Sequence, residues 1–158
     1  MLYTIVGLGN PGEEYKNTRH NTGRIVLDYF HKKNNFYDWE YSKNADALYS
    51  NSKIGKNKIE LIAPETFMNN SGKSVLYVKN KHKIKPENII VIYDDLDLPL
   101  GIFKIAFNRG SGGHNGIESV VKKVKTKAFI RVRVGVSPVT PTGKLKKPKG
   151  EEKVITLR

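Results

Sequence analysis

Four short segments of this 158-residue chain place amide, imidazole or glycine groups at positions where the pattern predicts loops. Asparagine side chains both donate and accept hydrogen bonds, and histidine is the side chain best suited to move a proton near neutral pH. A hydrolase site could be built from these groups, with His20 as the base and with the carboxylate of Asp94 holding its ring in one tautomer. The segments are residues 7–10, 18–21, 67–70 and 111–116, and they include Asn10, Asn69 and Asn115.

The surroundings of three histidines indicate whether each one has a chemical role. His20 comes at the start of an expected helix, where a lone histidine commonly does no more than bond to a neighbouring carbonyl group. The asparagines of the neighbouring segments indicate a chemical role for His20. His31 and His82 lie among lysines on expected helix surfaces, so we assign them no role.

Three aspartates within residues 94–97 raise the question of a metal site, because hard cations prefer closely spaced carboxylates. Along an extended segment, Asp94 and Asp95 would point to opposite faces, and apolar neighbours dilute the supply of oxygen ligands. We therefore expect no metal here and interpret Asp94 as the partner of His20. An aspartate that merely caps a loop would have the same sequence signature.

The pattern Gly7-x-Gly9-x-x-Gly12 follows an expected strand and matches the fingerprint of dinucleotide-binding sites. In those sites a helix opens within the glycines, and an acidic residue about 20 positions further on ends a second strand. Here Pro11 continues a loop, and Asp28 falls on the expected helix itself. We therefore expect no nicotinamide or flavin site.

A large excess of positive charge marks the composition, since 28 lysines and arginines against 15 acids give a net charge of +13 and a pI near 9.8. Residues 137–158 hold six basic residues and two acids, so +9 belongs to the rest of the chain. A polyanionic partner would suit this charge, because phosphate contacts release counterions and long-range attraction speeds encounter. Charge alone leaves two interpretations open, a nucleic-acid-binding protein or a lysine-rich composition set by codon bias.

The composition also bears on the chemistry and the compartment. The absence of cysteine from the sequence excludes disulfides, thiolate catalysis and cysteine zinc sites, in agreement with a reducing environment. Apolar runs stay far below the roughly 20 residues of a spanning helix. Residues 1–10 lack the basic leader of a signal peptide. We expect a cytoplasmic protein with no membrane contact.

Hydrophobic periodicity predicts one α/β domain, and 158 residues fit a single domain of ordinary size. Residues 89–93 form the clearest buried strand, and Asp94 would lie at its carboxyl end, where open α/β sheets favour ligand sites. From Ser137 onward the composition predicts loop or disorder, which divides the chain into a catalytic α/β domain of residues 1–136 and a basic tail of residues 137–158. The other expected elements are strands at 2–8, 102–107 and 130–136, a hairpin at 48–63, and helices at 21–33, 70–83 and 115–124.

The polar segments also occur in a characteristic order and spacing. They are Val6–Gly12, Tyr15, Thr18–Asn21, Pro64–Asn69, Ser71–Gly72, Asp94–Pro99, Gly101, Gly112–Gly116, Phe129, Arg131 and Arg133. Together they resemble the bacterial peptidyl-tRNA hydrolase family, and the similarity extends from residue 2 to about residue 138. The resemblance implies a single α/β domain with a mixed, twisted sheet flanked by helices.

The same resemblance implies an activity, namely hydrolysis of the ester that joins a peptide to the 3′ ribose of tRNA. This reaction recycles tRNA from chains that the ribosome has dropped. The implied enzyme needs no metal or other cofactor and is usually a monomer. His20 would be the general base that activates water, and Asp94 would orient and polarise it.

By position, the resemblance also implies the residues that contact the substrate. Asn10 and Asn69 would hold the peptide and the scissile carbonyl group. Asn115 would bind near the 3′ end of the tRNA or position the water. Tyr15 and Met68 would line the pocket.

For the acceptor arm of the tRNA, the resemblance points to Lys104 and Arg133 as a clamp on the phosphates. The family commonly has a further basic residue where this chain has Ala106, so Arg109 or a lysine of the tail would have to replace it. Family members also continue beyond Leu157 and end in a helix that packs on the sheet. We expect that helix to be missing, in either a short natural version or a truncated one. If nothing replaces it, an exposed apolar patch should lower stability or solubility.

One alternative comes from a different functional class. The chain could be an RNA-binding protein on the same fold that has lost hydrolysis, as the chloroplast splicing-factor relatives of the family have. The presence of His20, Asp94 and Asn10 together favours the hydrolase.

Overall fold

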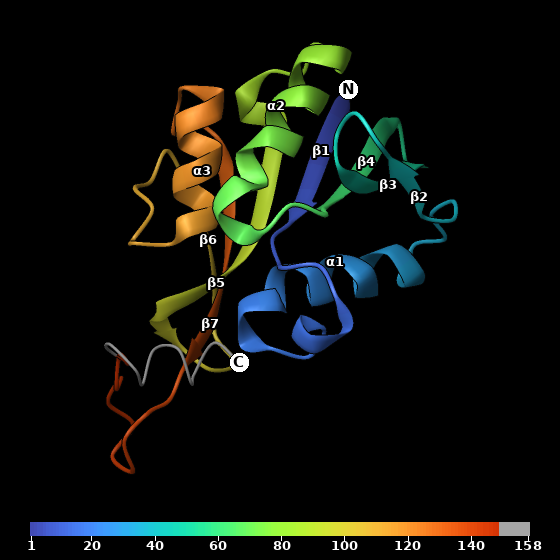
Figure 1. Ribbon diagram of the computed structural model, residues 1–158. Coiled ribbons are helices and arrows are strands. Elements are labelled where there is room, and N and C mark those ends of the chain that lie inside the picture. The colour runs from blue at the N-terminus through green and yellow to red at the C-terminus, as the bar shows by residue number, and fades with distance from the viewer. Residues whose placement is uncertain (149–158) are drawn as a thin grey trace.

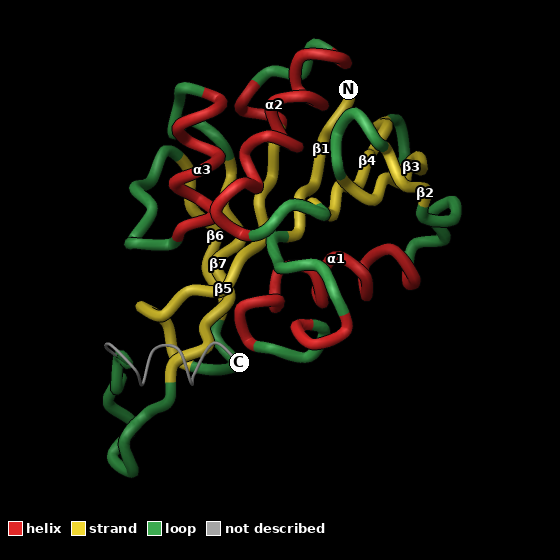
Figure 2. Tube along the Cα trace, in the orientation of Figure 1, coloured by secondary structure: helices red, strands yellow, loops and turns green. Residues whose placement is uncertain are grey.

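The protein is built on a mixed sheet of seven strands, and the computed structural model describes residues 1–148. The strands are β1 (Leu2–Gly7), β2 (Glu40–Ser42), β3 (Ala47–Ile54), β4 (Asn57–Pro64), β5 (Ile89–Pro99), β6 (Phe103–Phe107) and β7 (Ile130–Ser137). They lie in the order β2-β3-β4-β1-β5-β7-β6, as Figure 1 and Figure 2 show. The pairs β4–β1, β1–β5 and β5–β7 are parallel, whereas β2, β3 and β6 pair antiparallel at the two edges.

Within residues 1–148, three α-helices cover the sheet, as Figure 1 shows. α1 (Thr22–Lys33) lies on one face, where its Leu27 packs with Leu61 and Ile92. α2 (Ser71–His82) and α3 (Asn115–Val124) lie side by side on the other face, where they pack on Val6 and Val91. Two apolar cores therefore enclose the central strands, one on each side.

The sequence of α3 explains how this helix lies on the sheet. Ile117, Val120 and Val124 recur at helical spacing and are buried, whereas Lys122 on the opposite side is exposed. The helix ends at Lys125, which adopts the left-handed conformation at φ 61° that commonly closes a helix.

Gly23 allows α1 to approach the sheet unusually closely. A Cβ atom at this position would lie 2.1 Å from the carbonyl oxygen of Ile92 on β5 and 2.8 Å from the backbone nitrogen of Leu8. The start of α1 therefore rests directly on β5 at Ile92 and on the chain just after β1. This contact brings His20, which precedes α1, close to Asp94.

The structure confirms the predicted fold class, a single α/β domain with a mixed sheet and flanking helices. It differs from the predicted elements at β5, which continues through Asp94 to Pro99, so Asp94 lies inside the strand and not after it. The side chains of Asp94 and Asp95 both have bonded partners, which is why acidic residues can occupy a buried strand. The three-residue β2 was not predicted.

Residues 138–148 form a turn that contacts β5. Val139 pairs with Leu145, and Lys147 Nζ lies 2.6 Å from Asp97 Oδ1. The rest of the predicted tail lies outside the described residues, as does the end of the chain where a further helix was expected to be missing.

The edge strand β6 carries an exposed apolar strip. Phe103, Ile105 and Phe107 are 65%, 70% and 53% exposed. These side chains share one face of the sheet because alternate residues of a strand point the same way. Among residues 1–148, no helix combines the length and the apolar character that crossing a membrane requires.

Candidate active site

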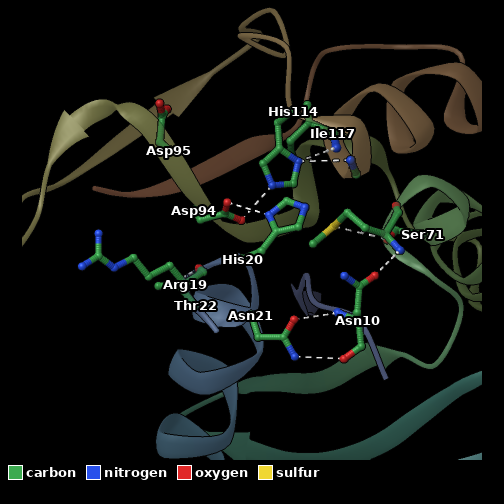
Figure 3. A network of polar contacts seen from close by, with 12 residues as sticks. Asn10, Arg19, His20, Asn21, Thr22, Ser71, Asp94, Asp95, His114 and Ile117 are labelled. Atoms are coloured by element: carbon green, nitrogen blue, oxygen red, sulfur yellow. Dashed lines mark hydrogen bonds and ion pairs between the residues drawn. The ribbon is translucent and has the colours of Figure 1, made fainter. Parts of the chain in front are cut away.

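His20 lies in a 3-10 turn (Arg19–Asn21) that leads into α1, and its ring points toward β5 (Figure 3). Its Nδ1 lies 2.7 Å from Oδ2 of Asp94, whose side chain is only 2% exposed. The two groups that the sequence predicts to meet are thus in hydrogen-bond contact, although 74 positions separate them in the chain. If Nδ1 donates to the carboxylate, Nε2 of His20 carries the free lone pair of a base.

A second imidazole bonds to the same carboxylate. His114 lies just before α3, and its Nε2 is 2.8 Å from the other oxygen, Oδ1, of Asp94. Its Nδ1 accepts hydrogen bonds from the backbone N–H groups of Gly116 and Ile117 at 3.1 and 3.2 Å. A nitrogen that accepts two N–H groups carries a lone pair, so the proton of His114 is on Nε2 and is donated to Asp94.

The ionisation of Asp94 follows from these neighbours. Burial would raise the pKa of its carboxyl group, but the neighbouring His114 and His20 outweigh burial and lower that pKa to about 2. Asp94 is therefore a carboxylate at neutral pH. It can accept the Nδ1 proton of His20 and stabilise positive charge that develops on that ring.

Asn10 is held in a fixed orientation beside this cluster. Its backbone N–H donates to Asn21 Oδ1 at 2.8 Å, and Asn21 Nδ2 donates to its carbonyl oxygen at 2.9 Å. Its own side-chain Oδ1 accepts the backbone N–H of Met68 at 2.8 Å. Because Oδ1 is engaged in this way, Nδ2 of Asn10 is the group that remains to donate to a substrate.

Gly9 makes the contact between Asn10 and Asn21 sterically feasible. A Cβ atom on Gly9 would lie 2.9 Å from Cγ of Asn21, which is a clash. The second glycine of the dinucleotide-like pattern therefore makes room for the amide of Asn21. This role differs from the close approach to a pyrophosphate that such a glycine allows in dinucleotide-binding sites.

A small cavity opens beside the imidazoles. His20, Asp94, His114 and Asn115 contribute to its lining, and its volume is about 50 Å³. A water molecule occupies about 30 Å³ in the liquid, so the cavity has room for a reacting water. Asn115, the first residue of α3, is thus placed where a side chain could position that water.

The cluster also has the composition of a metal site. One ligand atom each from His20, Asp94 and His114 lies within 4.8 Å of the others. The contacts described above already join these atoms in hydrogen bonds, and a bound metal would have to displace both imidazole protons. Asp95 and Asp97 do not join this cluster, because they pair with Arg133 and Lys147. The expectation of a metal-free site stays a prediction.

Comparison with known proteins shows the family of the chain. The family model for peptidyl-tRNA hydrolase matches residues 4–151. A peptidyl-tRNA hydrolase of Lactobacillus gasseri is 45% identical over 132 residues, which cover 84% of this chain and 70% of that protein. The chain belongs to the peptidyl-tRNA hydrolase family. A second member, from a Sulfurihydrogenibium species, is 46% identical over 142 residues, which cover 86% of this chain and 70% of the relative.

Solved structures of the peptidyl-tRNA hydrolase family share the fold. The crystal structure of the peptidyl-tRNA hydrolase of Acinetobacter baumannii superposes with a TM-score of 0.83 at 31% sequence identity. The match covers 98% of this chain and 81% of the crystallised chain.

Met68, Asn69 and Tyr15 are the remaining residues that the family resemblance assigned to the substrate, and Met68 bonds Asn10 through its backbone N–H. Met68 is 5% exposed, and the exposed Asn69 follows it in a 3-10 turn (Met68–Asn70) before α2. Tyr15 packs edge-on against Phe67 with ring centroids 6.4 Å apart. Their contacts with substrate remain predictions.

The two residues predicted to clamp tRNA have different surroundings. Lys104 on β6 is exposed and lies opposite Arg133 on β7. Arg133 is only 6% exposed, and its Nε lies 2.7 Å from Oδ2 of Asp95. Lys104 is the more accessible member of the predicted clamp, and the contacts of both residues with phosphate stay predictions.

His114 and Asn21 had no role predicted from the sequence. His114 had a detectable signal, since it precedes an expected helix within the Gly-Gly-His-Asn-Gly segment. Its contact with Asp94 depends on how α3 and β5 pack, which the local pattern does not specify. Asn21 acts through its bonds to the backbone of Asn10, eleven residues earlier, and has no distinct sequence signal.

Proposed function

We propose that this chain hydrolyses the ester between the peptide and the 3′ ribose of peptidyl-tRNA, with His20 as the general base. Membership of the family supports the reaction. The observation that carries the residue assignment is the 2.7 Å contact from His20 Nδ1 to Asp94 Oδ2, because it leaves Nε2 of His20 free to accept a proton.

The reaction proceeds in two steps. Nε2 of His20 removes a proton from water as the water oxygen forms a bond to the ester carbonyl carbon. The resulting tetrahedral intermediate collapses, and the bond from carbon to the ribose 3′ oxygen breaks. His20 returns its proton to that oxygen, so the products are a peptide with a free carboxyl group and tRNA with a free 3′ hydroxyl group.

Three further groups support these steps. Asp94 stabilises the imidazolium ring that forms on His20. Asn10 donates through Nδ2 to the oxyanion, and Asn115 positions the attacking water. A placed general base contributes about 10²- to 10⁴-fold in rate, and a single oxyanion donor contributes about 10²- to 10³-fold. An ester is already activated toward attack, so these contributions suffice without a covalent enzyme intermediate.

The charge of the molecule supports tRNA as the carrier of the ester. A net charge of +13 attracts a polyanion, and the exposed Lys104 offers a phosphate contact on β6, the sheet edge nearest β5 and β7. We propose a monomeric, cytoplasmic enzyme that uses no metal or other cofactor, as the family resemblance implies. Light scattering across a range of protein concentrations tests the monomer.

The reaction is tested with N-blocked aminoacyl-tRNA by following the release of free tRNA, with and without a metal chelator. We expect release by the wild-type protein at equal rates in both samples. His82→Ala is a matched control, because His82 Nδ1 also bonds a buried carboxylate, at 2.8 Å from Glu60 Oε2, but lies outside the site. Binding of tRNA without release would instead favour an RNA-binding protein that has lost hydrolysis.

A further inference from the structure

A second and larger pocket lies beside Asn10, on the side away from β5. It is enclosed by the loop that follows β1, by α1 and by the ends of β3 and β4, and its volume is about 530 Å³. Pockets that bind small ligands typically measure about 300 to 1,000 Å³. Because Asn10 and Asn21 belong to its lining, the pocket begins where the proposed oxyanion donor is held.

The pocket differs in charge from the rest of the molecule. Its lining contains three acids and two basic residues, whereas the whole chain carries a net charge of +13. These charges are paired, because Arg24 bonds Glu65, Asp28 lies 2.9 Å from Lys32 Nζ and Glu13 lies 4.0 Å from Lys16 Nζ. A lining without an excess of positive charge offers little attraction to phosphate groups, which favours the peptide part of the substrate here. The charged lining residues are Glu13, Lys16, Arg24, Asp28 and Glu65.

The walls combine an apolar surface with a fixed ion pair. The indole of Trp39 stacks on His31 with ring centroids 4.6 Å apart, and Leu48 adds further apolar area to the lining. Arg24 bonds to the carboxylate of Glu65, and its Nη1 donates to the carbonyl oxygen of Pro64 at 3.0 Å. A guanidinium has five N–H donors and a carboxylate accepts several bonds, so this pair can also serve the C=O and N–H groups of a peptide backbone.

The sheet order indicates which part of the substrate reaches this pocket. The catalytic groups follow β1 or lie on β5 in the middle of the sheet, Lys104 lies on β6 at one edge, and the lining of the pocket includes Leu48 of β3 and Ala63 of β4. Figure 1 shows β3 and β4 on the opposite side of β1 from β5. A substrate whose ester is at the centre and whose tRNA extends toward β6 directs its peptide toward β4.

We propose that the pocket between α1 and the β3–β4 hairpin binds the peptide upstream of the ester-linked residue, with an apolar side chain against Trp39 and Leu48. The peptide backbone bonds to the Arg24–Glu65 pair. This inference rests on the proposed function, because it extends the same substrate away from His20.

The first test compares three substrates by kcat/KM: N-acetyl-glycyl-tRNA, N-acetyl-glycyl-glycyl-tRNA and N-acetyl-phenylalanyl-glycyl-tRNA. The wild type should prefer the phenylalanyl substrate to its diglycyl counterpart by at least about tenfold, because the side chain becomes buried. Trp39→Ala should reduce this ratio to within about twofold of one. Tyr37→Ala, which removes a 73% exposed ring two positions away, should leave both the ratio and the basal turnover unchanged.

The ratio of kcat/KM between the phenylalanyl and the diglycyl substrates separates a specific effect from a loss of folding. A misfolded variant loses turnover of all three substrates, whereas loss of the pocket contact lowers only the preference for phenylalanine. A wild-type ratio near one, or a high ratio that Trp39→Ala leaves unchanged, overturns the proposal. Failure of the wild type to cleave any of the substrates would contradict the proposed function and not the pocket.

A second measurement needs no catalysis, because Trp39 is the single tryptophan of the chain and its fluorescence reports on this pocket. Titration with N-acetyl-phenylalanyl-glycine amide should change its emission in a saturable way, and the diglycyl amide should bind at least about tenfold more weakly. The double variant Arg24→Met and Glu65→Met should weaken binding of the phenylalanyl peptide. Emission that responds equally to both peptides, or to neither, overturns the proposal.

Discussion

Two imidazoles converge on the carboxylate of Asp94, and the second can be tested apart from the helix that it caps. His114→Asn retains a favourable N-cap residue for α3 but removes the Nε2–H that holds Asp94. We expect thermal stability close to that of the wild type and turnover lowered about tenfold or more, because a small misplacement of Asp94 and His20 is costly. Unfolding temperature and kcat are measured on the same preparation.

His114→Ala is the matched comparison. It removes the cap as well as the bond to Asp94, so we expect an additional loss of about 1 kcal/mol of stability. Turnover by His114→Asn equal to that of the wild type would show that His114 has only a structural role.

Asp94 also gives the stability of the protein a defined dependence on pH. Its folded pKa of about 2 lies below the ordinary aspartate pKa of 3.8, so the unfolded state binds the proton more strongly. The stabilising contribution of the carboxylate is fully present above pH 3.8 and is lost as the pH falls through about 2. Asp94→Asn lacks this contribution, so its difference in unfolding free energy from the wild type should change across that range. Urea unfolding at a series of pH values measures this difference. A difference that stays constant with pH would contradict the lowered pKa of Asp94.

Some of these residues could be predicted from the sequence and others could not. His20, Asp94 and Asn10 have types and positions that indicate chemistry, and the structure brings them to one place. Arg133 has the type expected of a phosphate contact, but its pairing with Asp95 depends on the register between β5 and β7. His82 was predicted to be a surface residue without a role, yet it bonds the fully buried Glu60. Such pairs depend on tertiary contacts that the local pattern does not encode.

The approach of α1 to the sheet is the contact between elements that most directly positions His20. In Gly23→Ala the new methyl group would lie 2.1 Å from the carbonyl oxygen of Ile92, so the helix would have to move away from β5. We expect a loss of at least about 3 kcal/mol in the free energy of unfolding, because backbone atoms on both sides resist the shift. Denaturant unfolding measures the change.

Gly110→Ala provides the control for this substitution. No heavy atom lies within 4 Å of a Cβ built at Gly110, so its stability should stay within about 0.5 kcal/mol of the wild type. Equal effects of the two substitutions would mean that α1 does not depend on the close approach.

The elements themselves were largely predictable, and the exceptions have physical reasons. Periodicity located all three helices and the buried strands because each buries one apolar side. The extension of β5 to Pro99 was missed because aspartates seldom occupy a strand, and here specific partners compensate for their burial. β2 was missed because three residues, Glu40–Ser42, are too few to show a period.

At the scale of the whole molecule, positive charge should control the affinity for tRNA. Each phosphate contact that is lost reduces the dependence of binding on salt concentration by about one unit of slope. We expect Lys104→Ala to do so, measured by tRNA binding over a series of salt concentrations. Lys53→Ala, at an exposed position of β3 near the opposite edge of the sheet, is the control and should leave the slope unchanged. An unchanged slope for Lys104→Ala would place the tRNA elsewhere.

The net charge of the chain and the lining of the larger pocket suit a substrate that has two unlike ends. The net charge of +13 suits the nucleic acid, whereas the paired charges and apolar walls of the 530 Å³ pocket suit a peptide. The ester that joins these parts would then lie over the central strands, next to His20.

The most direct test of this account is turnover by His20→Ala, measured as release of free tRNA from N-blocked aminoacyl-tRNA, alongside its affinity for tRNA. Removal of a general base should lower kcat by at least about 10²-fold. Affinity for tRNA should stay within about twofold, since the imidazole bonds Asp94 and not a phosphate. Wild-type turnover by His20→Ala would contradict the account, because the base would then have to be another group.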